Sequence, residues 1–140
     1  MSARFFLDTN IFVYSFDSRS PAKQKVAQDL IDKALSSQTG FISWQVVQEF
    51  LNVSLRKFEK PISLLEGRSY LDQVLGPLCE VFPTVKLYDR ALELKDETGF
   101  GFYDALIIVS ASEAGCKILY TEDLQNGRRV AGLTIRNPFV

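Results

Sequence analysis

The chain of 140 residues contains no histidine. Catalytic triads built on histidine, histidine-based ribonuclease chemistry and zinc sites that need an imidazole ligand are therefore excluded. Any catalysis has to rest on carboxylates, lysine, tyrosine, serine or threonine. The absence directs the search for a functional site toward acidic side chains.

Cysteine is scarce, since Cys79 and Cys116 are the only two. They form no CxxC pair and cannot build a disulfide framework, so free thiols in a reducing cytoplasm are expected. Long apolar runs are missing as well. The run at residues 5–7 ends at Asp8, and the run at 105–109 is far shorter than the roughly 20 residues of a membrane span. We expect a cytoplasmic protein without membrane attachment.

An excess of one charge is also missing, because 16 Lys and Arg face 17 Asp and Glu, for a net charge of -1. The chain therefore lacks the strongly basic coat of many nucleic-acid-binding proteins, although a local basic patch is compatible with this balance. Hydrophobic residues make up 46% and charged residues 24%, which is a globular composition. The length fits one domain over residues 1–140.

What is present is an alternation of short strands and helices. Apolar runs bounded by turn residues predict strands at 4–7, 41–43, 80–82, 117–120 and, as a last edge strand, 133–135. Helical apolar periodicity predicts helices at 11–16, 22–36, 44–58, 64–75, 87–98 and 102–114. Gly76 and Pro77 are expected to end the fourth helix, and residues 127–129 to form a turn. This alternation favours an α/β fold with a mostly parallel sheet of four to five strands.

Two carboxylates follow predicted strands. Asp8 comes directly after residues 4–7, and Asp123 comes shortly after residues 117–120. The ligand crevice of an open parallel sheet lies outside the carboxyl ends of its strands, so both acids are expected at the same edge. The alternative is that each acid only caps a helix or a turn.

Two further acids stand in apolar surroundings on predicted helices. Asp104 is the lone acid in the apolar run 102–109 and lies in the first helical turn, where the helix dipole favours an anion. No Lys or Arg lies within its local turn, so a buried Asp104 needs a cation or a set of hydrogen bonds. Glu49 lies at the edge of the apolar stripe of helix 44–58. The alternative for Asp104 is an ordinary acid in the first turn of a helix. The alternative for Glu49 is an exposed residue on the surface of its helix.

Four carboxylates brought together repel one another unless a divalent cation neutralises them. Sites built from carboxylate oxygens and water suit Mg²⁺ or Mn²⁺. A metal held in this way can activate a water molecule and stabilise the leaving oxygen of a phosphodiester. This chemistry needs no histidine, in agreement with the composition.

The acids stand in four short segments that follow one another along nearly the whole chain. These are residues 6–14 (FLDTNIFVY) with Asp8, 43–50 (SWQVVQEF) with Glu49, 101–107 (GFYDALI) with Asp104, and 119–127 (LYTEDLQNG) with Asp123. The chain closes on the tripeptide Asn-Pro-Phe at 137–139. In this order the segments resemble the PIN-domain family, and in particular the VapC-type toxins.

The resemblance implies a three-layer α/β/α sandwich and a divalent-metal site formed by the four acids. It also implies ribonuclease activity, and Asn10 and Thr121 match positions that help to orient the acids. A VapC-like toxin further implies a cognate VapB-like antitoxin that fills the groove beside the site, and a homodimer as the common state.

The leading hypothesis is thus a Mg²⁺- or Mn²⁺-dependent endoribonuclease, the toxin of a toxin–antitoxin pair. Five basic residues are candidates for guiding the RNA backbone, with solvated surface charge as the alternative: Arg56, Lys57, Lys60, Arg128 and Arg129.

Two other functions compete with this hypothesis. A phosphoryl-handling α/β domain would use Asp8 as its nucleophile. A haloacid-dehalogenase-like site would, however, need a second Asp where this chain has Asn10, and a receiver-like site would need a lysine at a strand end, whereas Lys117 begins its strand. The other alternative is a non-catalytic module whose acidic pocket receives an arginine of a partner.

Overall fold

The computed structural model of the chain describes residues 3–140. Its centre is a six-stranded sheet in the order β3-β2-β1-β4-β6-β5. The strands are β1 (Phe5–Leu7), β2 (Gly40–Ser43), β3 (Cys79–Val81), β4 (Ile118–Tyr120), β5 (Arg129–Val130) and β6 (Leu133–Arg136). All neighbouring strands are parallel except β5 and β6. The predicted α/β class with a mostly parallel sheet is therefore confirmed.

The sheet has one strand more than the four to five predicted. The extra strand, β5, has two residues and includes Arg129, which was predicted to lie in a turn. It pairs antiparallel with β6 and takes the edge position, so β6 is an inner strand and not the predicted edge. Two residues are too few to produce an alternating apolar pattern, which explains why the sequence did not indicate this strand.

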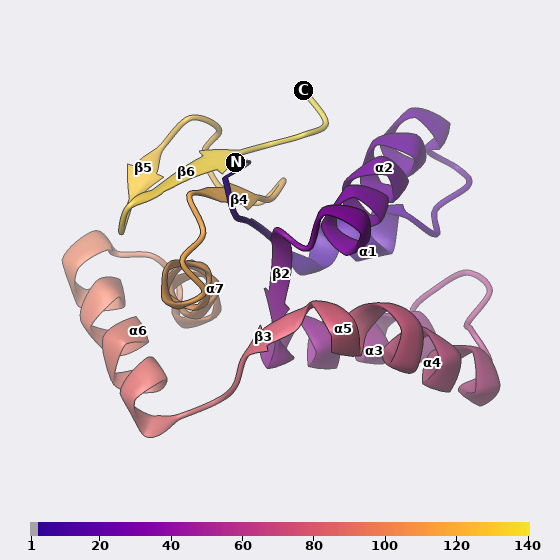
Figure 1. The fold of residues 1–140 in the computed structure, drawn as a ribbon, viewed down its shortest axis with the longest axis horizontal. Coiled ribbons are helices and arrows are strands. Elements are labelled where there is room, and N and C mark those ends of the chain that lie inside the picture. The colour runs from indigo at the N-terminus through magenta and orange to yellow at the C-terminus, as the bar shows by residue number, and fades with distance from the viewer. Residues whose placement is uncertain (1–2) are drawn as a thin grey trace.

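Helices cover both faces of the sheet. They are α1 (Thr9–Tyr14), α2 (Pro21–Ser37), α3 (Trp44–Arg56), α4 (Leu64–Tyr70), α5 (Gly76–Leu78), α6 (Val85–Thr98) and α7 (Phe102–Glu113), with one π-helical turn, η1 (Leu71–Leu75). Figure 1 shows α6 and α7 on one side of the sheet and α1 to α5 on the other. This is the expected three-layer arrangement. Within residues 3–140, every helix is too short or too polar to cross a bilayer.

The helical segment after Ser63 is longer than predicted. Gly76 and Pro77 do not end it, because η1 and α5 continue to Leu78. Pro77 is the second residue of α5, which follows η1 without a break. The chain reaches β3 directly from α5.

Burial of β1 and α7 fixes the centre of the molecule. The three side chains of β1 are all buried, as expected for a central parallel strand. Helix α7 is apolar almost all round and buried from Ala105 to Ala111, because the sheet lies on one side of it and α6 on the other (Figure 1). This confirms the prediction of a buried helix and places Asp104 at the start of a rigid element.

Candidate active site

The carboxyl ends of β1 and β4 bring the first and last acidic segments together. The two strands are adjacent and parallel, and Leu7 is level with Tyr120. The backbone N–H of Asp8 donates to the Tyr120 carbonyl at 3.0 Å, so β1 and β4 end side by side. The predicted placement of Asp8 and Asp123 at the same edge of the sheet is therefore confirmed.

The Asp8 side chain is held at both of its oxygens. Its Oδ1 accepts a hydrogen bond from the Thr9 backbone N–H at 2.7 Å, and its Oδ2 accepts one from the Thr121 hydroxyl at 2.8 Å. Asp8 is also the N-cap of α1, as the capping interpretation expected. Only 7% of the residue is exposed. The carboxylate thus has a fixed orientation and little contact with water.

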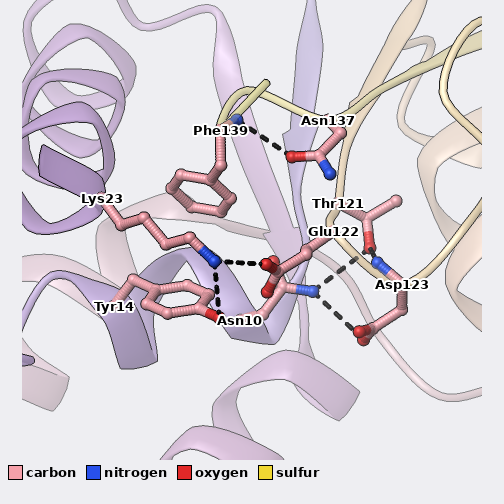
Figure 2. A network of polar contacts seen from close by, with 8 residues as sticks. All are labelled: Asn10, Tyr14, Lys23, Thr121, Glu122, Asp123, Asn137 and Phe139. Atoms are coloured by element: carbon pink, nitrogen blue, oxygen red, sulfur yellow. Dashed lines mark hydrogen bonds and ion pairs between the residues drawn. The ribbon is translucent and has the colours of Figure 1, made fainter. Parts of the chain in front are cut away.

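Thr121 and Asn10 connect Asp8 with Asp123. The buried Thr121 hydroxyl accepts from the Asn10 amide at 3.2 Å and from the Asp123 backbone N–H at 3.1 Å. The same Asn10 Nδ2 donates to Asp123 Oδ2 at 3.1 Å, as Figure 2 shows. Asp8, Thr121, Asn10 and Asp123 therefore form one chain of hydrogen bonds across the ends of the two strands.

The other two acids come from helices and are half-buried. Glu49, on α3, accepts a hydrogen bond from the Thr9 hydroxyl at 2.8 Å, which ties α3 to the start of α1. Asp104 lies in the first turn of α7. No group within residues 3–140 donates a hydrogen bond to its carboxylate. Sequence reasoning gave no role to Thr9, because its partner lies 40 residues away and no local pattern indicates the contact.

Burial and neighbouring charges change the acidity of this site. Burial raises the pKa of Asp8 to about 6. The hydrogen bonds from Thr121 and Thr9 work against this shift, while the charges of Asp123 and Glu49 add to it. The pKa of Asp104 is raised as well, by burial and then by Asp123. Mutual repulsion among the acids is thus present, but burial is the larger cause.

The donor chemistry of the site fits a divalent cation. The buried Asn10 Oδ1 finds no hydrogen-bond donor in the part of the chain that the structure describes. With the nearby carboxylates it offers the oxygen donors that Mg²⁺ and Mn²⁺ prefer. No three acidic side chains within residues 3–140 already lie close enough together to hold an ion. Ion binding would therefore require the side chains to turn toward one point.

A pocket lies at the other end of the α1–α3 pair. The two helices are in contact at Thr9 and Glu49. One turn further along each helix, Val13 and Val53 both line this pocket, which has a volume of about 600 Å³. Lys57 belongs to the rim of this pocket. The helices therefore run side by side from the acids to the pocket.

The candidate RNA-binding residues do not form one patch. Lys57 and Lys60 both line the pocket beside α1, and Arg56 is exposed on the last turn of α3. Arg128 instead has its guanidinium carbon 4.3 Å from the centroid of the Phe100 ring. Arg129 is exposed on the edge strand β5, at the other end of the sheet from β2 and β3, which α3 contacts. Of the five candidates, only Arg56, Lys57 and Lys60 lie near α1 and α3.

Comparisons with known proteins agree with the fold described above. A family model described as the PIN domain matches residues 5–133. No curated protein sequence matches the chain. Among solved structures, a toxin-antitoxin complex from Klebsiella pneumoniae is similar, with 18% identity, a TM-score of 0.69 and coverage of 98% of each chain.

Two further solved structures are similar to this chain. FitAcB from Neisseria gonorrhoeae has 18% identity and a TM-score of 0.65, over 96% of this chain and 98% of that one. VapBC2 from Rickettsia felis, bound to a DNA fragment from their promoter, has 23% identity and a TM-score of 0.61, over 95% and 97% of the two chains. At these identities the likeness shows a shared fold.

Proposed function

The chain belongs to the PIN domain family, and from this premise we propose that it is a divalent-metal-dependent endoribonuclease and the toxin of a toxin–antitoxin pair. The observation that carries the proposal is the hydrogen-bonded chain from Asp8 through Thr121 and Asn10 to Asp123. It fixes two carboxylates beside an unpartnered amide oxygen at the carboxyl ends of adjacent parallel strands. Ligand sites of open α/β sheets lie at such an edge.

Four acids are proposed to hold the ion: Asp8, Glu49, Asp104 and Asp123. A bound Mg²⁺ or Mn²⁺ supplies positive charge to the phosphodiester and makes a water molecule a stronger nucleophile. The protein contributes orientation. Thr121 fixes the Asp8 carboxylate, Asn10 fixes that of Asp123, and Thr9 fixes that of Glu49.

The RNA is proposed to run along α1 and α3 toward the pocket beside them. Lys57 and Lys60 place positive charge on this path, and Arg56 adds to it. The pocket also offers Phe16 as an aromatic wall for an unstacked base. Arg128 and Arg129 are weaker candidates, because they lie at the other end of the sheet and Arg128 already packs on an aromatic ring.

A protein partner is the second part of the proposal. The solved relatives include toxin-antitoxin complexes, and this chain has large apolar side chains exposed on α4, with Leu64 76% and Leu65 77% exposed. We propose that a VapB-like antitoxin covers the pocket beside α4, which Phe16, Leu65 and Tyr70 line. A second copy is proposed on the surface formed by Phe82 and Val85, which gives a homodimer. An RNA substrate and free thiols fit a cytoplasmic protein.

A second candidate function uses the same acids. Asp104 and Asp123 are near enough for the charge of Asp123 to raise the pKa of Asp104, and two neighbouring carboxylates suit a non-catalytic module that binds a partner's arginine. The phosphoryl-handling alternative is disfavoured. Asn10 stands where a haloacid-dehalogenase-like site would need a second Asp, and Lys117 precedes β4 and does not follow it, as a receiver-like site would need.

Cleavage of total cellular RNA by the purified protein tests the proposal. We expect cleavage with Mg²⁺ or Mn²⁺, its loss on chelation with EDTA, and its loss in Asp8→Ala. Asp89→Ala, which removes an exposed acid from α6, is the matched control and should cleave normally. Cleavage that survives both EDTA and Asp8→Ala would contradict the proposed mechanism. A protein that binds an arginine peptide but never cleaves RNA would support the non-catalytic module.

A further inference from the structure

A second polar cluster is built around Lys23, beside the contacts of Asn10 with Thr121 and Asp123 (Figure 2). Lys23 from α2 places its Nζ 2.7 Å from Glu122 Oε1, and the same Nζ donates to the Tyr14 hydroxyl at 3.3 Å (Figure 2). Tyr14 belongs to α1, and Glu122 to the segment that follows β4. One lysine therefore connects the consecutive helices α1 and α2 with a segment that lies 99 residues further along the chain.

Aromatic rings surround the lysine. Its Nζ is 4.6 Å from the centroid of the Tyr14 ring and 5.6 Å from that of Phe139, and the two rings are 4.8 Å apart. The Lys23 side chain is 38% exposed and that of Glu122 is 28% exposed. The pair is thus more sheltered than an ordinary surface ion pair, and the rings add cation–π attraction.

The ring of Phe139 is itself held in place. Its backbone N–H donates to Asn137 Oδ1 at 2.9 Å, and the backbone N–H of Asn137 donates to Asn126 Oδ1 at 2.9 Å. Figure 2 shows the Phe139 ring beside the Lys23 side chain. The segment 137–139 therefore closes one side of the cluster and returns to the same loop that carries Asp123.

Glu122 and its two neighbours have different partners. Glu122 reaches Lys23, whereas Thr121 and Asp123 both contact Asn10 (Figure 2). Asn10 and the tyrosine of the cluster are four residues apart, which places them one turn apart on the same side of α1. Helix α1 is thus connected to residues 121–123 at two points, directly through Asn10 and, one turn further on, through the lysine that bonds to both Tyr14 and Glu122.

We propose that Lys23 is a positioning residue for Asp123. By pairing with Glu122 it fixes residues 121–123 against α1 and α2, and it keeps the second carboxylate of this segment out of the acidic site. Asp123 then faces Asn10 as the single acid that the segment contributes. The inference rests on the proposed function, since only there does Asp123 belong to an ion site.

The pair matters because Glu122 is adjacent in sequence to Asp123. Without the ammonium of Lys23, the Glu122 carboxylate would carry an uncompensated charge beside a like charge and would move toward solvent. The segment would lose its anchor on the cluster side, and the Asn10–Asp123 contact would loosen. Loss of a partner that orients a metal ligand typically weakens metal binding by about 10–100-fold.

The test compares three variants of α2. Lys23→Met removes the charge and keeps a side chain that packs on the rings, and Lys23→Arg restores the charge. Lys25→Met removes the same charge from an exposed lysine of the same helix, whose partner Asp29 lies on α2. Each protein is measured by the nuclear magnetic resonance signals of the Asn10 side-chain amide without metal, by calorimetric Mn²⁺ affinity, and by kcat and KM for RNA cleavage.

We expect Lys23→Met to shift the Asn10 amide signals, to weaken Mn²⁺ binding by about tenfold and to lower kcat with little change in KM. Lys23→Arg should restore most of each property, and Lys25→Met should match the wild type. Adding Glu122→Gln to Lys23→Met should cost little more than either change alone, because both remove the same pair.

Two results would overturn the inference: unchanged Asn10 signals in Lys23→Met, or equal effects of Lys23→Met and Lys25→Met. Failure of the proposed function has a different outcome, in which the wild type neither binds Mn²⁺ nor cleaves RNA. In that case the Asn10 signals, which need neither metal nor RNA, still decide whether Lys23 positions the segment.

Discussion

The acids that follow strands and the acids that stand on helices are held in different ways. Asp8 is buried with both oxygens in hydrogen bonds, and Asp123 is joined to it through Thr121 and Asn10. Asp104, at the other extreme, is half-buried, and no group within residues 3–140 donates to its carboxylate. The strand ends therefore provide a rigid half of the site, in which two acids share one chain of hydrogen bonds. In the helical half, as far as the structure describes the chain, Glu49 has one hydrogen bond from Thr9 and Asp104 has none, so Asp104 is the acid that can adjust.

This difference has an energetic meaning. Folding fixes the orientation of the acids in the rigid half. Burial of the charged Asp8 carboxylate costs free energy, and this cost appears as a raised pKa of Asp8. Asp104 keeps the freedom to turn toward a ligand, whereas Glu49 is held by the Thr9 hydroxyl. Changes in the rigid half should therefore affect folding and function together, whereas changes in the helical half should affect function with little effect on folding.

The largest effect is expected at Asp8. We expect Asp8→Asn to lower RNA cleavage by at least about 100-fold, because it removes a fixed charge that no neighbouring acid can replace. Initial rates in the presence of Mn²⁺ measure the loss, with Asp89→Asn as the control. A rate within a few-fold of the wild type would show that the rigid half does not carry the chemistry.

The second prediction concerns the stability of the metal-free protein as a function of pH. The pKa of Asp8 rises from 3.8 to about 6 on folding, so its protonated form stabilises the fold below about pH 4, and this contribution is lost as the pH rises through about 6. The wild type should lose up to about 3 kcal/mol across this range relative to Asp8→Asn. Urea unfolding of both proteins in EDTA at pH 4, 5, 6 and 7 measures the difference. Parallel pH curves would contradict the assigned burial of Asp8.

The third prediction compares the two threonines that orient acids. Thr121→Val should lower the free energy of unfolding by about 1–3 kcal/mol, because its buried hydroxyl serves Asp8, Asn10 and the Asp123 backbone. Thr9→Val removes one hydrogen bond to Glu49 and should cost about 1 kcal/mol. Chemical unfolding of both variants at pH 7 provides the comparison. A larger loss of unfolding free energy in Thr9→Val than in Thr121→Val would contradict the assignment of Asp8 and Asp123 to the rigid half.

The smallest effect on the fold is expected at Asp104. Burial and then the charge of Asp123 raise the pKa of Asp104, so Asp104→Asn relieves an unfavourable charge. The melting temperature of the metal-free protein at pH 7 should stay the same or rise, while RNA cleavage falls about tenfold or more. A clear fall in melting temperature would show that Asp104 is a structural cap and not part of an adjustable half.

The sequence was sufficient to predict the sheet edge at which Asp8 and Asp123 meet. Asp8 directly follows an apolar run and Asp123 comes shortly after another. Because the carboxyl ends of parallel strands share an edge, local pattern and topology together decide the placement. The buried helix around Asp104 was predictable for a similar reason, since a segment that is apolar all round has no solvent face.

The contacts that orient the acids were not predictable. Thr9 bonds to Glu49 across 40 residues, and Lys23 pairs with Glu122 across 99 residues, so neither contact leaves a local pattern in the sequence. The sequence also did not predict which of the basic residues lie together. Arg128 is one of two adjacent arginines, yet only the folded structure shows its guanidinium over an aromatic ring.

The most direct test of the account is a crystal structure of the metal-free protein soaked with Mn²⁺, with anomalous scattering used to locate the ion. The account predicts an anomalous peak within bonding distance of the Asp8 and Asp123 carboxylates, with the Asp104 or Glu49 side chain turned toward it and the backbone of residues 121–123 unmoved. The peak should be absent in crystals of Asp8→Asn. A peak elsewhere in the molecule, or none at this edge of the sheet at saturating Mn²⁺, would contradict the proposal that these acids form the ion site.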